Sequence, residues 1–189
     1  MPATLIVVSG PPGSGKTTLA QAIGEALPCP VISRDAIKEG MVHAEGGAFE
    51  TAPGDPLTQR TLPLFFDVLA LLLRGGVTVV AEAAFQDGRW QAGLEPLLEV
   101  AELRVVQCYT DAGVGRERAV RRSEARLAVS RHAPGDGTNP AIEHSVEEWR
   151  ELYAAFERIS LAVPSLEVDT TSGYRPALDE VVDFCRAPS

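Results

Sequence analysis

Apolar and polar positions alternate along the chain in a way that predicts strands and helices in regular succession. Short apolar runs typical of buried strands occur at residues 4–9, 30–33, 77–82, 103–109 and 165–169. Segments with apolar residues at helical spacing occur at residues 15–26, 35–43, 57–74, 89–100, 113–128, 145–160 and 175–185. This order predicts an α/β fold, in which helices cover both faces of a five-stranded parallel sheet.

Proline and glycine mark the expected breaks. Pro63 predicts a kink or a late start in the third helix, which Gly75 and Gly76 are expected to end. Residues 44–56 and 133–140 are rich in Gly and Pro and are predicted to be mobile loops at the carboxyl edge of the sheet, where ligands bind in this architecture. The 189 residues are expected to form one domain.

The segment after the first apolar run is the most informative of the chain. Residues 10–17 read Gly-Pro-Pro-Gly-Ser-Gly-Lys-Thr between a predicted strand and a predicted helix, which is the context of a phosphate-binding P-loop. An ordinary Gly/Pro turn is the alternative, but such a turn would not require this pattern of residues between a strand and a helix. The sequence therefore predicts a nucleoside triphosphate site, and its nucleotide-binding residues here are Gly10, Pro11, Pro12, Gly13, Ser14, Gly15, Lys16, Thr17 and Thr18.

The chemistry of a P-loop explains these residue types. Glycines let the backbone wrap tightly, so that N–H groups and the start of the next helix face the β-phosphate. Lys16 is predicted to reach the β- and γ-phosphates, and the Thr17 hydroxyl is predicted to coordinate Mg²⁺.

Composition and charge narrow the partners. Seventeen basic and 26 acidic residues give a net charge of −9, which disfavours broad nucleic-acid binding and favours a small acceptor. Cys29, Cys108 and Cys185 have no metal-type spacing and are expected to be reduced, so the cytoplasm fits best. The longest wholly apolar run, residues 68–73, is far shorter than the ~20 residues of a membrane helix, so no membrane span is expected. The oligomeric state stays open.

Two acidic residues lie at or just after the ends of predicted strands. Asp35 follows Ser33 and Arg34 at a helix start, where it is predicted to accept the proton of an acceptor hydroxyl. Arg34 and Asp35 are both predicted to bind the substrate. The alternative is a helix cap made by Ser33 or Asp35. Glu82 ends the third strand and is predicted to hold Mg²⁺, directly or through a water, or to bind the acceptor; a solvated strand end is its alternative.

An arginine-rich stretch follows the fourth strand. Six of the seventeen basic residues lie within residues 116–131, and Arg118, Arg122 and Arg126 share one helix face. A solvated face with internal pairs is one interpretation. The other is a helical lid at about residues 112–140 that brings guanidinium groups to the phosphates. We expect Arg118 and Arg122 to act in catalysis, Arg118 also to bind the nucleotide, and Arg126 and Arg131 to bind substrate.

The last predicted strand ends in Asp169, Thr170 and Thr171, before a glycine. This polar loop is predicted to contact the nucleotide base, and a helix cap is the equal alternative.

Together these pieces resemble the small P-loop kinase family related to polynucleotide 5′-hydroxyl kinases, chloramphenicol phosphotransferase and zeta toxins. The resemblance spans nearly the whole chain. It implies ATP with Mg²⁺ as donor, Asp35 as catalytic base, lid arginines near Arg118 and Arg122 on the phosphates, and adenine between the lid base and residues 169–173. Residues 40–62, which would shape the acceptor pocket, match no acceptor-specific pattern.

The leading hypothesis is an ATP-dependent phosphotransferase that acts on a hydroxyl of a small molecule. A polynucleotide 5′-hydroxyl kinase is the first alternative, because it would share every donor-site feature. The second is a nucleotide-dependent binding switch or accessory ATPase that transfers no phosphoryl group.

Overall fold

The structure, a computed structural model, describes residues 3–45, 55–129 and 144–186. Its strands are β1 (Thr4–Ser9), β2 (Val31–Ser33), β3 (Val79–Glu82), β4 (Glu102–Tyr109) and β5 (Ser165–Asp169). Its helices are α1 (Lys16–Ala26), α2 (Arg34–Glu45), α3 (Pro56–Arg74), α4 (Asp87–Leu94), the 3-10 helix η1 (Glu95–Glu99), α5 (Ala112–Val129), α7 (Val146–Ala154) and α8 (Leu178–Arg186). All strand pairs are parallel, in the order β2-β3-β1-β4-β5. The predicted α/β fold is confirmed.

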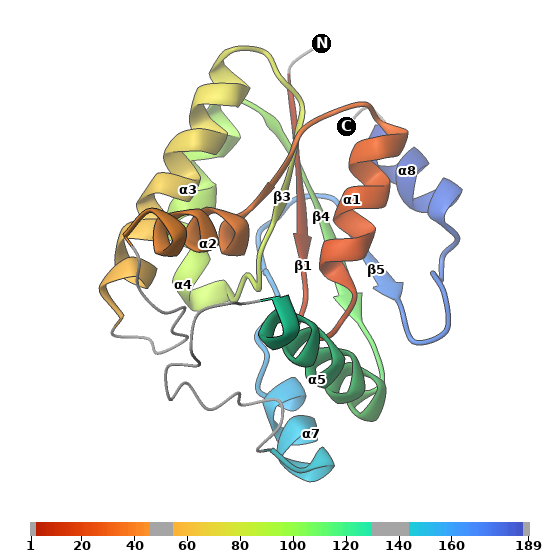
Figure 1. Cartoon of the computed structure of the whole chain (residues 1–189). Helices are drawn as coiled ribbons and strands as arrows, with labels where there is room; N and C mark the ends of the chain where they lie inside the picture. The colour runs from red at the N-terminus through yellow and green to blue at the C-terminus, as the bar shows by residue number, and fades with distance from the viewer. Residues whose placement is uncertain (1–2, 46–54, 130–143, 187–189) are drawn as a thin grey trace.

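Both faces of the sheet are covered, as the continuous apolar runs require (Figure 1). In β1, Leu5 and Val7 pack on one face among residues of α3 and α4. Ile6 and Val8 pack on the other face, among residues of α1 and α8. Alternate residues of one strand therefore serve two separate apolar cores.

Some helix boundaries differ from those expected, and α8 begins at Leu178 instead of residue 175. The predicted helix at 89–100 is α4 followed by η1, because Pro96 has no N–H to continue α-helical bonding. The predicted helix at 145–160 ends at Ala154. A late start of the third helix is wrong, because Asp55 accepts hydrogen bonds from the backbone N–H groups of Leu57 and Thr58 and caps α3 at Pro56. Its predicted end at Gly75 is confirmed.

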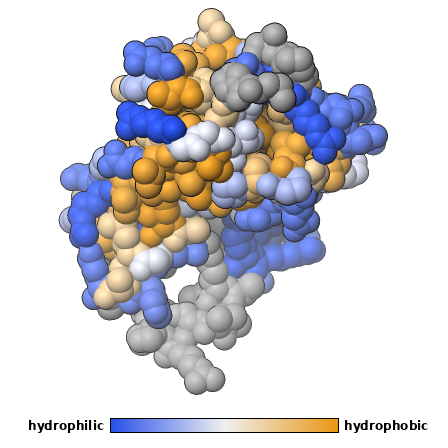
Figure 2. Space-filling model, turned by 90° about the horizontal axis from the view of Figure 1, so that it is seen from above, coloured by the Kyte–Doolittle hydropathy of each residue, from blue (hydrophilic) through white to orange (hydrophobic). Residues whose placement is uncertain are grey.

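Helix α3 is long and apolar enough, by length and composition alone, to cross a membrane. Core helices pass the same test, and Phe65, Leu69 and Leu73 of α3 are buried in the core. Figure 2 shows an apolar area on the face at the amino ends of the strands. Leu71 of α3 is 73% exposed. The expectation that no segment spans a membrane stays a prediction.

The carboxyl ends of the strands point toward α5 in Figure 1. Because β1 is central, the loop after β1 is flanked by the ends of β2 and β3 on one side and of β4 and β5 on the other. This edge is where every predicted site segment begins. The predicted loops at 44–56 and 133–140 lie largely or wholly outside the described residues.

Candidate active site

Residues 10–17 connect β1 to α1 as the predicted glycine-rich loop. Gly13 and Gly15 have φ angles of 76° and 78°, in the left-handed region that residues with side chains rarely adopt. Gly15 is the N-cap of α1, so the amino end of this helix opens onto the loop. The hydroxyl oxygen of Ser14 is buried and has no hydrogen-bond partner among the described residues. Such a loop with an unpartnered hydroxyl fits a phosphate group.

Lys16 begins α1 and is only 6% exposed. Its Nζ lies 4.0 Å from Oε1 of Glu82. Burial lowers the pKa of Lys16, and the nearby carboxylates of Glu82 and Asp35 partly oppose this shift. A polyphosphate at the loop would stabilise the charged ammonium further. Of the other predicted nucleotide-binding residues, Gly10 and Pro11 are buried, and Pro12 and Thr18 are exposed.

Glu82, the last residue of β3, joins three elements. Its Oε1 accepts a hydrogen bond of 3.1 Å from the Thr17 hydroxyl of α1, and its Oε2 accepts one of 2.6 Å from the Ser33 hydroxyl of β2. Glu82 is 3% exposed, so the alternative of a solvated strand end is wrong. A hydroxyl and a carboxylate suit Mg²⁺, which keeps most of its other ligands as water or phosphate oxygen. No cluster of three His, Cys, Asp or Glu residues that could hold a metal occurs in the described part of the chain.

Ser33 is the residue of this group that the sequence considered only as a cap. It does approach the N–H of Ala36, at 3.5 Å, but its short bond is to Glu82. The pairing of β2 with β3 places Ser33 directly opposite Glu82. Only the strand order could have revealed this contact, because 49 residues separate the two in sequence.

Asp35 lies in the first turn of α2, next to Arg34. Its Oδ1 accepts a hydrogen bond of 2.8 Å from Nη1 of Arg34, and its side chain is 51% exposed. The Arg34 side chain is 19% exposed, and its buried Nε has no partner in the described structure. Asp35 is close enough to Lys16 to act on the lysine pKa. The predicted base and the predicted phosphate-binding lysine therefore belong to one site.

A buried ion pair, which the sequence did not predict, joins α2 to α3. Lys38 is 1% exposed, and its Nζ lies 2.7 Å from Oδ2 of Asp55 and 2.6 Å from the Thr58 hydroxyl. The hydrogen bond from Lys38 holds the pKa of Asp55 well below its ordinary value. The pair therefore holds α2 against the start of α3. The sequence gave no indication of this ion pair, because a single lysine in a predicted helix has no recognisable partner.

Arg118 of α5 contacts the loop after β5. Its Nη2 donates to the carbonyl oxygens of Thr170 and Thr171, at 2.7 and 3.2 Å, and its Nη1 donates to the Thr170 hydroxyl at 3.2 Å. A Cβ on Gly15 would lie 3.6 Å from Nη1 of Arg118. The guanidinium thus lies beside the P-loop, at the base of the predicted lid.

The other predicted arginines are less tied to the site. Arg122 is exposed, one helical turn beyond Arg118, and acts on the pKa of Lys16. Arg121 pairs with Glu117 on the exposed face, as in the solvated interpretation. The Arg126 side chain and the whole of Arg131 lie outside the described part of the chain.

The loop after β5 adjoins the P-loop directly. The Thr170 hydroxyl donates a hydrogen bond of 2.7 Å to the Ser14 carbonyl oxygen. Asp169 accepts a hydrogen bond of 2.8 Å from the N–H of Thr171, and the side chain of Thr171 also hydrogen-bonds to Asp169, so the pKa of Asp169 is lowered. Asp169 therefore organises this loop, whereas Thr170 joins it to the nucleotide-binding segment.

Comparison with known proteins places this fold among those of P-loop kinases. Residues 5–159 match the profile of a family described as AAA domain. A kinase candidate from Chloroflexus aurantiacus has 25% sequence identity and a TM-score of 0.76, covering 98% of this chain and 97% of that one. No curated protein matches the sequence.

Two further structures share the fold at lower identity. APS kinase CysC of Mycobacterium tuberculosis, solved with AMPPNP and APS, has 17% identity and a TM-score of 0.63, with 98% of both chains covered. A gluconokinase from Sinorhizobium meliloti has 21% identity and a TM-score of 0.54, covering 97% of this chain and 89% of that one. These likenesses extend the resemblance seen in the sequence to the three-dimensional fold.

Proposed function

The chain belongs to this AAA domain family and has the fold of P-loop kinases, and from that premise we propose that it is an ATP-dependent kinase for a hydroxyl group of a small molecule. One observation carries the proposal. At the carboxyl edge of the sheet, the P-loop residues Lys16 and Thr17 contact Glu82, and Asp35 is near enough to act on the pKa of Lys16. Lys16 and Glu82 are buried, whereas the side chain of Asp35 is half exposed. A phosphoryl-transfer site needs this combination of a phosphate clamp, a metal-binding pair and an accessible base.

Each group has a distinct role in the proposed reaction. The P-loop amides and Lys16 hold the β- and γ-phosphates, and Thr17 and Glu82 would hold Mg²⁺. Bound Mg²⁺ would supply charge neutralisation on those phosphates. Asp35 accepts the proton of the acceptor hydroxyl as the acceptor oxygen bonds to the γ-phosphorus. The bond from that phosphorus to the β–γ bridging oxygen breaks, and the electron pair leaves with ADP.

Charge on the acceptor side favours a small molecule over an oligonucleotide. The arginine and the lysine of α2 already have carboxylate partners, Arg34 with Asp35 and Lys38 with Asp55. A polynucleotide acceptor carries one backbone phosphate for each nucleotide, and basic side chains normally neutralise these charges. The described residues therefore favour an uncharged or cationic hydroxylated acceptor.

An acceptor screen that follows ATP consumption tests the proposal. The panel contains nucleosides, sugars, aminoglycosides, other hydroxylated antibiotics and a short oligonucleotide with a free 5′-hydroxyl. We expect stimulation by one of the small molecules and none by the oligonucleotide. Transfer to the oligonucleotide would instead establish the polynucleotide kinase. Slow hydrolysis that no acceptor stimulates would point to an ATP-dependent switch.

Asp35→Asn then tests the assigned base with the acceptor found. We expect kcat to fall by about 10²- to 10⁴-fold, while calorimetry finds Mg-ATP affinity nearly unchanged. Asp67→Asn, on an exposed position of α3, is the matched control and should leave both values alone. Transfer by Asp35→Asn at the parental rate would show that Asp35 is not the base.

A further inference from the structure

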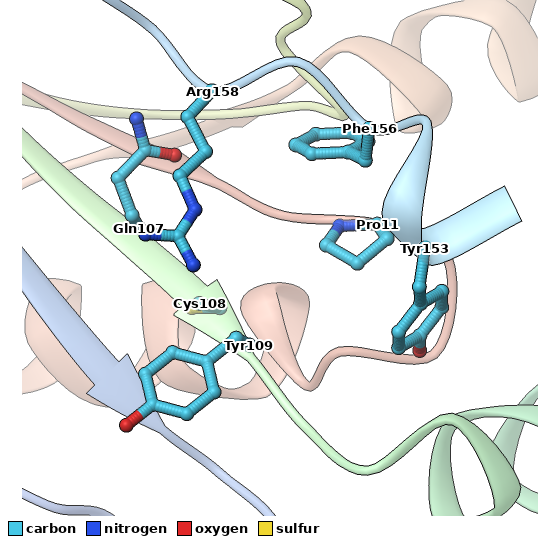
Figure 3. A pocket seen from close by; sticks show the side chains of 7 residues that line it. All are labelled: Pro11, Gln107, Cys108, Tyr109, Tyr153, Phe156 and Arg158. Atoms are coloured by element: carbon cyan, nitrogen blue, oxygen red, sulfur yellow. The ribbon is translucent and has the colours of Figure 1, made fainter. Parts of the chain in front are cut away.

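The back of the P-loop, away from α1, is covered by residues of α7 and the segment after it. Figure 3 shows a pocket there, with Pro11 of the loop facing Tyr153 and Phe156. Tyr153 is the second-last residue of α7 and lies 141 residues from the loop in sequence. Its hydroxyl donates a hydrogen bond of 2.6 Å to the carbonyl oxygen of Pro12. None of the roles assigned above uses this contact.

Close backbone packing brings the lid helix to the same point. A Cβ on Gly13 would lie 2.1 Å from the carbonyl oxygen of Gly115 in α5. A Cβ on Gly115 would in turn lie 1.8 Å from the Tyr153 hydroxyl. Both distances are far below ordinary van der Waals contact. At Gly13 the obstacle is backbone, so only glycine fits there, whereas at Gly115 a side chain would have to displace the Tyr153 hydroxyl. The P-loop, α5 and α7 therefore meet without intervening side chains except that of Tyr153.

Helix α7 is held in place at its start and along its buried side. Before its start, the carbonyl oxygen of His144 accepts a hydrogen bond of 2.6 Å from Nε of Arg116 in α5. Ser145 and Glu148 form a capping box at the first turn. Trp149 is 2% exposed and packs near the Tyr153 ring, with ring centroids 6.2 Å apart. The Tyr153 hydroxyl is thus presented to Pro12 from a fixed helix.

Peptide geometry gives this bond a consequence for phosphate binding. In a planar trans peptide the carbonyl C=O and the next N–H point in opposite directions. A Pro12 carbonyl that accepts from Tyr153 therefore leaves the N–H of Gly13 directed away from Tyr153. We propose that this N–H faces the phosphate cradle and that Tyr153 is a positioning residue, which orients the Pro12–Gly13 peptide for nucleotide binding. This inference rests on the proposed ATP site.

Burial raises the pKa of Tyr153, so its hydroxyl stays a donor across the physiological range. Tyr153→Phe removes the hydroxyl and keeps the ring. We expect a Kd and a KM for Mg-ATP about three- to tenfold higher, the size of one lost hydrogen bond, with kcat within about twofold of the parent. Tyr109→Phe, in the same pocket but with its hydroxyl directed away from Pro11 (Figure 3), is the control and should bind Mg-ATP as the parent does.

Gly115→Ala supplies an independent test, because its methyl group would displace the Tyr153 hydroxyl. We expect it to weaken Mg-ATP binding by a similar factor, and the double variant with Tyr153→Phe to be no weaker than Gly115→Ala alone. Calorimetry gives the Kd values, and thermal unfolding checks each variant.

The outcomes separate this inference from the proposed function. A lower Tm of Tyr153→Phe with unchanged Kd would make Tyr153 merely structural and overturn the inference. Independent, multiplicative effects of the two substitutions would overturn it as well. Failure of the unmodified chain to bind Mg-ATP would overturn the proposed function together with this inference.

Discussion

The Thr17 hydroxyl donates a 3.1 Å hydrogen bond to the Glu82 carboxylate, which joins the first helix to the end of the third strand. The two residues come from segments 65 positions apart, and both were expected at a Mg²⁺ site from their places in the sequence alone. The bond holds the two oxygen atoms close together before any metal binds. Glu82 is therefore the first residue to test.

Glu82→Gln should raise the Mg²⁺ concentration needed for activity by about ten- to a hundredfold, because an amide oxygen is a poorer ligand than a carboxylate. The amide oxygen keeps one acceptor for Thr17 or Ser33, so the fold should survive. Titration of activity with Mg²⁺ at saturating ATP measures the change. Glu102→Gln, at the start of β4, is the control. An unaltered Mg²⁺ requirement in Glu82→Gln would remove Glu82 from the metal site.

The lowered pKa of Lys16 predicts a pH dependence of nucleotide binding. Desolvation favours the neutral amine, so the lysine loses its proton below the ordinary pKa of 10.5. Because the phosphates bind the charged form, Mg-ATP affinity should fall as pH rises through the alkaline range. Calorimetry at several pH values above 7 measures this fall. Lys16→Met should bind weakly at every pH, and a pH slope as steep in that variant would assign the effect to another group.

Arg118→Ala should weaken Mg-ATP binding about tenfold, because the loop at Thr170 and Thr171 loses its charged hydrogen-bond donor. The matched control is Arg121→Ala on the same helix, whose side chain is 74% exposed and pairs with Glu117. The control should change binding little. Calorimetry on the two variants compares them directly, and equal losses would indicate a general charge effect.

Lys38→Met should lower the free energy of unfolding by about 3 kcal/mol, because it leaves Asp55 beside an apolar group in place of its ammonium partner. Chemical denaturation at pH 7 measures this loss. Asp55 has a depressed pKa when folded, so its contribution is present above the ordinary pKa of 3.8 and is lost as the pH falls below it. In Lys38→Met this acid-dependent part of the stability should shrink. A loss of stability below pH 4 as steep in Lys38→Met as in the parent would contradict the pairing.

Local patterns in the sequence were sufficient for the fold and for half of the site. The five apolar runs predicted the strands to within two residues at each end, since parallel strands buried on both faces read as continuous apolar segments. The P-loop could be predicted because glycine conformation and phosphate binding are both local properties. Asp35 and Glu82 followed from their places at strand ends.

The remaining contacts depend on which strands and helices become neighbours. Ser33 meets Glu82 only through the pairing of β2 with β3, and Tyr153 meets Pro12 only because α7 folds back to the loop. Lys38 needed a carboxylate from the start of α3. The change from α4 to η1 was missed for a different reason: the apolar spacing of residues 89–100 continues through Pro96, which ends the α-helical bonding.

The central position of β1 divides the carboxyl edge of the sheet into two sides. Segments that follow β4 and β5 lie on one flank of the phosphate cradle, and those that follow β2 and β3 lie on the other. In the proposed reaction, the first flank contacts the donor through Arg118 of α5, and the second flank presents Asp35 of α2 to the acceptor. Related proteins of this fold would then change their acceptor through substitutions on one side of β1 alone, while the P-loop that binds the donor stays the same.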